Sequence, residues 1–185
     1  MANGFDYLEF ATCARYGDLE EMKENIRASF EETNAATLRS IFTYKVPPSN
    51  STALHMASAN NHIDIVKYLL EHLTNGDVNL QNDDGATALH WASLNGHKQV
   101  VSLLLKAGAD ATIKNNAGRS SLTMSEQQGH LEVSQLLLDS FEPDADSIQE
   151  TDEDVSVDDV ESGVKDMKVS SDDTIADSTS EDVGR

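Results

Sequence analysis

A seven-residue phrase occurs twice in this chain with a single substitution. The first copy, TALHMAS, occupies residues 52–58, and the second, TALHWAS, occupies residues 87–93. Each copy is followed by an Asn-x-His turn and then by an apolar run with helical spacing. Units repeated at a fixed period stack on one another, because a single unit cannot bury its apolar face alone. The repeat therefore predicts a solenoid, an architecture that offers an extended binding surface and has no built-in catalytic site.

A third, weaker copy shares the register of the first two. Leu54, Leu89 and Leu122 are equivalent and lie 35 and 33 residues apart, and the histidines of the Asn-x-His slot keep the same spacing. A unit of about 33 residues with a T-x-L-H-x-A core is typical of the ankyrin repeat, a β-turn followed by two antiparallel helices. The predicted fold class is all-α, an ankyrin-repeat solenoid of about four stacked helix-turn-helix units with β-turn fingers.

The register divides the chain into five predicted segments. Cys13 takes the slot of the core alanines Ala57 and Ala92, which indicates an additional divergent unit at the N-terminal side. The two extra residues of the first interval fall in the connection 71–77, where a stacked array tolerates insertion. The segments are a divergent capping repeat with a connecting helix near 35–42 (1–46), two ankyrin repeats (47–81 and 82–114), a degenerate capping repeat (115–141) and an acidic tail (142–185).

Negative charge is concentrated in that tail. The whole chain has a formal net charge of −20. Residues 142–185 contain 16 acidic and 3 basic residues and therefore contribute −13 of this charge. Such a segment, which has no aromatic residue, is predicted to be disordered. The charge argues against a nucleic-acid ligand and favours a basic protein partner, with an acidic groove and tail as the complementary surface. The tail positions expected to contact this partner are Asp152, Glu153, Asp154, Asp158, Asp159 and Glu161. The alternative is that the tail serves only to keep the protein soluble.

Features that direct a chain to a membrane or an oxidising compartment are missing from the sequence. The first residues lack the basic residues and the apolar core of a signal peptide, and no apolar stretch reaches 18 residues. The chain has one cysteine, which cannot form an internal disulfide. We therefore expect a protein of the cytoplasm and nucleus, monomeric before its partner binds.

Six histidines invite a metal interpretation, but five of them recur with the architectural period. A residue that repeats with the fold is most simply structural, and no C-x-x-C or H-x-x-x-H pair is present. Cys13 lies in a core slot, where a buried thiol is inert. The sequence predicts no metal site, no cofactor and no catalytic residue.

Partner-binding positions are expected on the finger tips and on the groove face of the first helix of each unit. Trp91 is the only tryptophan, and large aromatic residues often anchor interfaces, although burial between repeats is the alternative for its slot. The carboxylates of Asp83 and Asp84 are expected to pair with a lysine or arginine of a partner. The alternative is that the two residues only form a solvent-exposed turn. The candidate contact residues are Met56, Asn60, Asp83, Asp84, Trp91, Leu94, Asn95, Met124, Gln127 and Gln128.

The phrases STALHMA (51–57), NHI (61–63) and TALHWASLNG (87–96) resemble the fungal ankyrin-repeat chaperones of small-subunit ribosomal protein S-three. The layout is similar too, with a divergent first unit, two strong repeats, a degenerate last unit and an acidic tail. The resemblance implies a chaperone that keeps a basic client, a ribosomal protein, soluble before ribosome assembly. The alternative function is an adaptor whose groove binds a peptide of a signalling or transcription-regulatory protein.

Overall fold

The computed structural model describes residues 5–30 and 33–141. The chain divides into two units, residues 1–148 and 149–185, and all described residues belong to the first. Every regular element in them is a helix, and none of these helices is long and apolar enough to cross a membrane. The tail positions singled out from the sequence, from Asp152 to Glu161, lie outside the described residues.

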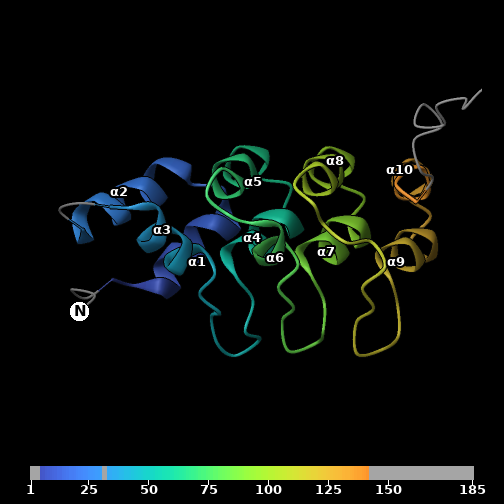
Figure 1. Ribbon diagram of the computed structural model, residues 1–185, viewed down its shortest axis with the longest axis horizontal. Helices are drawn as coiled ribbons and strands as arrows, with labels where there is room; N and C mark the ends of the chain where they lie inside the picture. Colours follow the sequence, from blue (N-terminus) through green and yellow to red (C-terminus); the bar gives the residue numbers. More distant parts are fainter. Residues whose placement is uncertain (1–4, 31–32, 142–185) are drawn as a thin grey trace, which may run out of the picture. The chain divides into compact units, whose positions relative to one another are not determined.

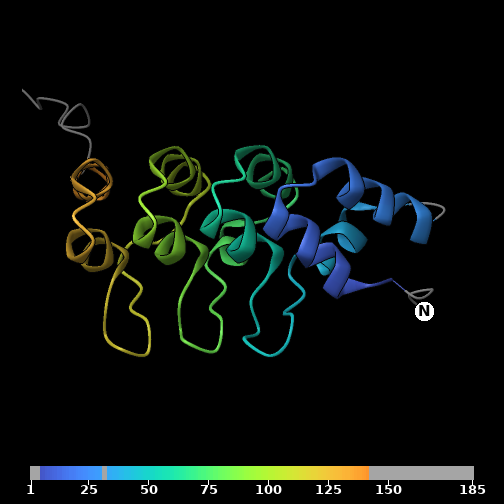
Figure 2. The ribbon, with the colours of Figure 1, turned by 180° about the vertical axis from the view of Figure 1, so that it is seen from behind.

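Helices of the first unit form a row of pairs arranged in two layers, which Figure 2 shows from behind. The first helices of the pairs contact one another in order along the row, and each packs on the second helix of its own pair. This arrangement confirms the predicted all-α repeat solenoid. The inner layer holds α1 (Tyr7–Tyr16), α4 (Ala53–Ala59), α7 (Ala88–Leu94) and α9 (Ser121–Gln127), and the outer layer holds α2 (Leu19–Ser29), α5 (Ile63–Leu70), α8 (Lys98–Lys106) and α10 (Leu131–Asp139).

Three long loops, here called fingers, extend from the same side of the row, and each leads into an inner helix (Figure 1). Two of them are closed by isolated antiparallel bridges, Val46 with Ser51 and Lys114 with Ser120. One position per finger has left-handed backbone: φ is +53° at Asn50, +69° at Gly85 and +72° at Gly118. These three residues are equivalent in the repeat register. The tight turn therefore explains why the slot holds only glycine or asparagine, which adopt this conformation at low cost.

Buried histidines connect each of the first two fingers to the helix that follows it and to the next finger. The backbone N–H of Thr52 donates to Nδ1 of His55 over 3.2 Å, so Nε2 carries the proton and donates to the carbonyl oxygen of Ala86 over 3.0 Å. The Thr52 hydroxyl lies 2.8 Å from the same Nδ1 and forms part of a capping box at the start of α4. Thr87 and His90 repeat this arrangement at the start of α7.

A second set of histidines binds backward along the row. Nε2 of His62 lies 2.8 Å from the carbonyl oxygen of Arg15, in the pair before it. His97 and His130 make the same contact with the carbonyl oxygens of the preceding inner helices, at 3.0 Å and 3.1 Å. The periodic histidines are therefore structural, as predicted. This second set satisfies backbone carbonyls that the helix ends leave open, and His55 and His90 satisfy carbonyls in the fingers.

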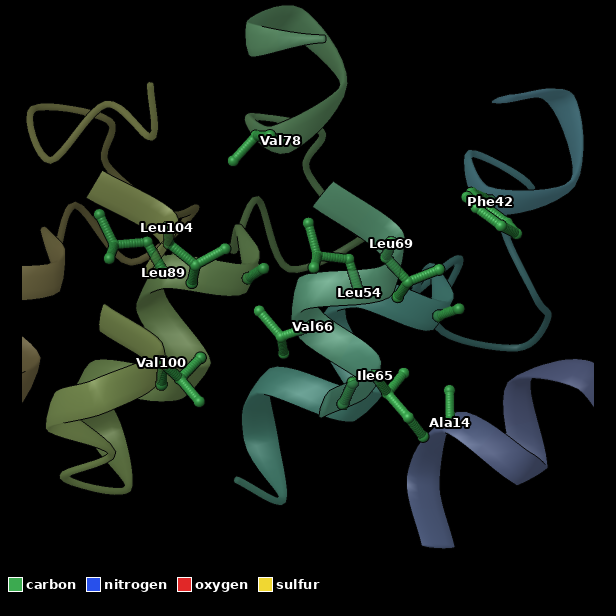
Figure 3. Packing of buried hydrophobic residues seen from close by; sticks show 14 of the residues in the cluster. Ala14, Phe42, Leu54, Ile65, Val66, Leu69, Val78, Leu89, Val100 and Leu104 are labelled. Atoms are coloured by element: carbon green, nitrogen blue, oxygen red, sulfur yellow. The ribbon is translucent and has the colours of Figure 1, made fainter. Parts of the chain in front are cut away.

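The core is formed where the two layers meet and where neighbouring pairs stack (Figure 3). Leu54 and Leu89 of the inner helices, and Val66, Leu69 and Leu104 of the outer helices, are each at most 2% exposed. Burying a leucine or valine side chain contributes about 1.5–3 kcal/mol. Since the side chains of one pair are covered by the next, this energy holds the row together.

Aromatic side chains replace aliphatic ones at the N-terminal side of the core. Phe10 of α1 stacks on Phe42 with the ring centroids 5.7 Å apart, and Phe5 packs on Phe10 at 5.6 Å. Cys13 is buried beside them in the slot of the core alanines, as predicted. Burial, reinforced by the charges of Glu21 and Asp18, raises the pKa of its thiol to about 11. The thiol is therefore protonated and unreactive at neutral pH.

Two insertions interrupt the regular pairs and are fastened to each other. The helix α3 (Ala35–Phe42) occupies the range expected for a connecting helix. The longer connection after α5 contains a short helix, α6 (Asn75–Val78), which the sequence analysis treated only as an inserted loop. Arg39 of α3 donates from Nε and Nη2 to the two carboxylate oxygens of Asp77 in α6, at 2.7 Å and 2.9 Å.

Candidate protein-binding groove

A hollow of about 360 Å³ lies between the inner helices and the first two fingers. Its residues come from α1, the first finger, α4, the second finger and α7, so the stacking of successive units creates it. It brings together five residues predicted from the sequence, namely Met56, Asn60, Asp84, Trp91 and Asn95. We call this hollow the groove.

The floor of the groove is apolar and its edge carries carboxamides. Met56, Ala59 and Trp91 are half-buried, so they present apolar surface without being sealed inside the fold. Nδ2 of Asn60 donates to the carbonyl oxygen of Met56, and Nδ2 of Asn95 donates to that of Ala59, both over 2.8 Å. These bonds fix the orientation of the two amides and leave their side-chain oxygens as the atoms that can accept from a partner.

The groove also includes residues that the sequence analysis did not select. Asn82 lines it and holds the second finger in shape, because its Oδ1 accepts from the backbone N–H groups of Asp84 and Ala86. Arg15 contributes from α1. The register could have revealed it: Arg15 follows Cys13 by two residues, as Ala59 follows the core alanine Ala57. By the same register Tyr16, which is 75% exposed, is equivalent to Asn60.

Other predicted contact residues lie outside the groove. Leu94 is half-buried, and Gln127 and Gln128 are exposed on the last inner helix. Asp83 is exposed at the finger tip, where its Oδ1 accepts from Nδ2 of Asn50 over 2.8 Å. The choice of Met124 is wrong: it is 6% exposed, because in the last unit the side chain turns into the finger and approaches Asn115.

The expectation of an acidic groove is also wrong. Among the residues that line it, Asp84 is the only acid and Arg15 the only base, so the groove carries no net charge. His55 lines it as a neutral group, since burial lowers the pKa of this histidine to about 4 and both ring nitrogens are engaged. An apolar floor with fixed amides suits an apolar side chain of a peptide whose backbone bonds to the edge.

Nothing in the groove resembles a reaction centre. The histidines within reach are committed to backbone groups, and in residues 5–30 and 33–141 no three His, Cys, Asp or Glu side chains gather in a way that could hold a metal ion. A row of helix pairs with fingers and one neutral concave hollow defines a protein-binding repeat solenoid.

Comparison with known families agrees with this class. The family described as ankyrin repeats (3 copies) matches residues 10–115 and 73–152. The chain therefore belongs to the ankyrin-repeat family, a protein-interaction family whose members are not typically enzymes.

Two relatives are informative beyond the family. The ankyrin repeat-containing protein YAR1 of Saccharomyces cerevisiae is 43% identical over 58 residues, which are 31% of this chain and 26% of that protein. The match thus spans about a quarter of the relative. The crystal structure of the yeast ribosomal protein Rps3 in complex with its chaperone Yar1 contains a chain that superimposes with a TM-score of 0.65 at 38% identity, covering 75% of this chain and 95% of that one.

Proposed function

We propose that this protein is a chaperone of the small-subunit ribosomal protein Rps3, which it holds in solution before ribosome assembly. The observation that carries the proposal is the similarity to the Rps3–Yar1 complex, which extends over 95% of the matched chain at 38% identity. Proteins this similar in sequence and fold commonly keep the same partner. The mode of action is stoichiometric binding without catalysis, in the cytoplasm and nucleus.

Two parts of the chain have different tasks in this proposal. The neutral groove anchors a segment of the client through Met56 and Trp91, whose apolar surfaces bind independently of charge. The 16 acidic residues of the tail, which lie beyond the groove in the sequence, attract the basic client and mask its charge. Salt should therefore weaken the contribution of the tail and leave that of the groove almost unchanged.

The test is a binding experiment with purified Rps3 at low and high salt. The full chain should form a one-to-one complex and keep Rps3 soluble at both concentrations. A variant that ends at Phe141 should associate at least ~10-fold more slowly at low salt and dissociate at nearly the same rate. A control protein of equal net charge without ankyrin repeats should lose Rps3 at high salt. The proposal fails when Rps3 precipitates equally with and without the chain.

A second function, an adaptor for a peptide of a signalling or transcription-regulatory protein, is favoured by one observation. The groove has no net charge, whereas a groove dedicated to a basic client would be expected to hold several acids. In that case the tail would be dispensable and a neutral peptide would bind the groove. Purification of partners from lysate with the full chain and with the variant ending at Phe141 distinguishes the two functions, because only for a chaperone of a basic protein does removal of the tail reduce the recovery of the main partner.

A further inference from the structure

A second hollow lies at the N-terminal side of the solenoid, separate from the groove. Its volume is about 530 Å³, and it lies between the start of α1 and the base of the first finger. Phe5 and Val46 are buried at its floor, whereas Leu8 and Tyr44 are 62% and 42% exposed. The residues that line this N-terminal hollow are Phe5, Asp6, Tyr7, Leu8, Tyr44, Val46 and Pro47.

Two tyrosines form an aromatic wall of the N-terminal hollow. The rings of Tyr7 and Tyr44 stack with their centroids 3.9 Å apart and an angle of 26° between the planes. Leu8 stands beside them as one of the most exposed large apolar residues of the described chain. Exposed apolar and aromatic surface of this kind is costly in a free protein, which suggests that it contacts a partner.

The charge of the N-terminal hollow is negative, unlike that of the groove. Among the described residues that line it, Asp6 is the only charged one. The Oδ1 atom of Asp6 accepts from the backbone N–H groups of Leu8 and Glu9, at 2.9 Å and 3.0 Å, so the carboxylate is fixed while Oδ2 remains able to bind a partner. The nearby Lys45 does not neutralise it, because its Nζ donates to the carbonyl oxygen of Gln81 in the second finger over 2.7 Å.

The two hollows lie along the same pair of elements. The first finger contributes Val46 and Pro47 to the N-terminal hollow and Ser49 and Ser51 to the groove. On α1, Leu8 lines the former and Arg15 the latter. Seven residues of α-helix span about 10 Å, the length of about three extended residues. A single client segment can therefore occupy both hollows.

We propose that the N-terminal hollow binds an arginine of the basic client. The guanidinium stacks on the exposed ring of Tyr44, and its N–H groups are directed at the Asp6 carboxylate. Arginine fits this combination better than lysine, because its planar group stacks on aromatic rings and forms paired bonds with a carboxylate. The adjacent Leu8 covers the aliphatic part of the side chain. This assignment rests on the proposed chaperone function and adds the part of the client that the N-terminal hollow recognises.

A pair of matched variants tests the assignment in the full chain with Rps3 as the probe. Asp6→Asn removes the charge and keeps an N-cap, since asparagine caps helices as well as aspartate. Asp18→Asn removes the same charge from the N-cap of α2, where Asp18 accepts from the N–H of Glu21 outside the N-terminal hollow. We expect Asp6→Asn to weaken binding of Rps3 about 5-fold at low salt and Asp18→Asn less than about 2-fold.

The outcomes separate the two proposals. Equal effects of Asp6→Asn and Asp18→Asn, with Rps3 still bound, overturn the arginine site and leave the chaperone function standing. Failure of the unaltered chain to bind Rps3 overturns the function and the site together. A photo-crosslinking residue at Leu8 gives an independent result: crosslinks to an Rps3 segment that contains an arginine support the site. Crosslinks to a segment without arginine, or only to residues 1–4 of the same chain, refute it.

Discussion

The Nε2 atom of His55 lies 3.0 Å from the carbonyl oxygen of Ala86, across the boundary between two repeats. The other ring nitrogen accepts from the N–H of Thr52, so the imidazole is neutral in the folded chain. Burial lowers the pKa of His55 to about 4 and also lowers that of His90, which makes the same contact one repeat further on. Protonation of either ring would place a charge inside the stack and break the link at Nδ1.

Stability should therefore fall in mild acid. In the unfolded chain His55 takes up a proton below about pH 6.5, whereas in the folded chain it does so only near pH 4. Its contribution is present above pH 6.5 and is lost as the pH falls from there to about 4, by about 3 kcal/mol in total. Urea unfolding between pH 7.5 and 4 measures the loss. His55→Gln should lower stability at neutral pH and flatten this decline, and an unchanged decline would contradict the assignment.

Gly96 and Gly129 offer a matched pair for testing how the repeats are packed. Both follow an inner helix in the same slot, with φ of +73° and +76°. A Cβ on Gly96 would lie 2.6 Å from Nδ1 of His130, whereas a Cβ on Gly129 would meet no atom of the described residues within 4 Å.

Replacing either glycine by alanine costs about 1–2 kcal/mol for the left-handed backbone. Gly96→Ala should cost at least about 1 kcal/mol more, because it must also displace the His130 ring that binds the carbonyl oxygen of Leu94. Denaturant unfolding of the two variants gives the difference directly. Gly129→Asn serves as a control for the backbone cost, since Asn61 occupies the same slot one repeat before Gly96 and has a φ of +60°. Equal losses in both alanine variants would show that His130 moves without cost.

Arg39 and Asp77 fasten the two insertions, and the pair predicts a coupling between them. Partial burial acts against ionisation of Asp77, but hydrogen bonds from Arg39 and Thr74 prevail and hold the pKa of its carboxyl group below the usual value. Arg39→Ala should lower the Tm by no more than about 4 °C, since Arg39 is exposed and the solvent screens the pair. Arg27→Ala, which removes a 3.7 Å contact with Glu24 within one helix, is the control and should have a smaller effect. Additive effects of Arg39→Ala and Asp77→Asn would exclude the coupling.

Repeat register predicted most of the fold because a few slots have physical requirements that the sequence repeats. The Thr-x-x-His link, the small core alanines and the left-handed finger position recur with the period and appear in the structure where the register places them. The small helix α6 was missed because Thr74 and Asp77 form a capping box within an insertion that has no counterpart in the other repeats.

The residues of the groove were only partly predictable from the repeat register, because some of them lie outside the two clear repeats. Its central residues Met56 and Trp91 lie in the two strong repeats, whereas Arg15 belongs to the divergent first unit, where only the alignment of Cys13 with the core alanines shows the register. Met124 keeps the slot of Trp91, yet it is buried, and its sulfur lies 3.8 Å from Nδ2 of Asn115 in the third finger. The neutrality of the groove was not predictable from net charge, because charge counts do not say which faces carry the charges.

Trp91 provides the sharpest test of the groove itself. The side chain is half-buried on the groove floor beside Met56, and the equivalent slot in the preceding repeat is filled by that methionine. In the proposed complex with Rps3, Trp91→Ala should weaken binding by about 10-fold or more, because it removes the largest apolar surface in the groove. Trp91→Met keeps apolar volume in a slot that already accepts methionine and should weaken binding less than about 3-fold.

Both effects should be nearly independent of salt, because the floor is uncharged, and this separates them from the effects of Asp6→Asn. Calorimetric titration at two salt concentrations measures all three variants, with unfolding curves to confirm that each is folded. A loss for Trp91→Ala that disappeared at high salt would mean that the tryptophan acts only by positioning charged neighbours, and the groove would then not be an apolar anchor.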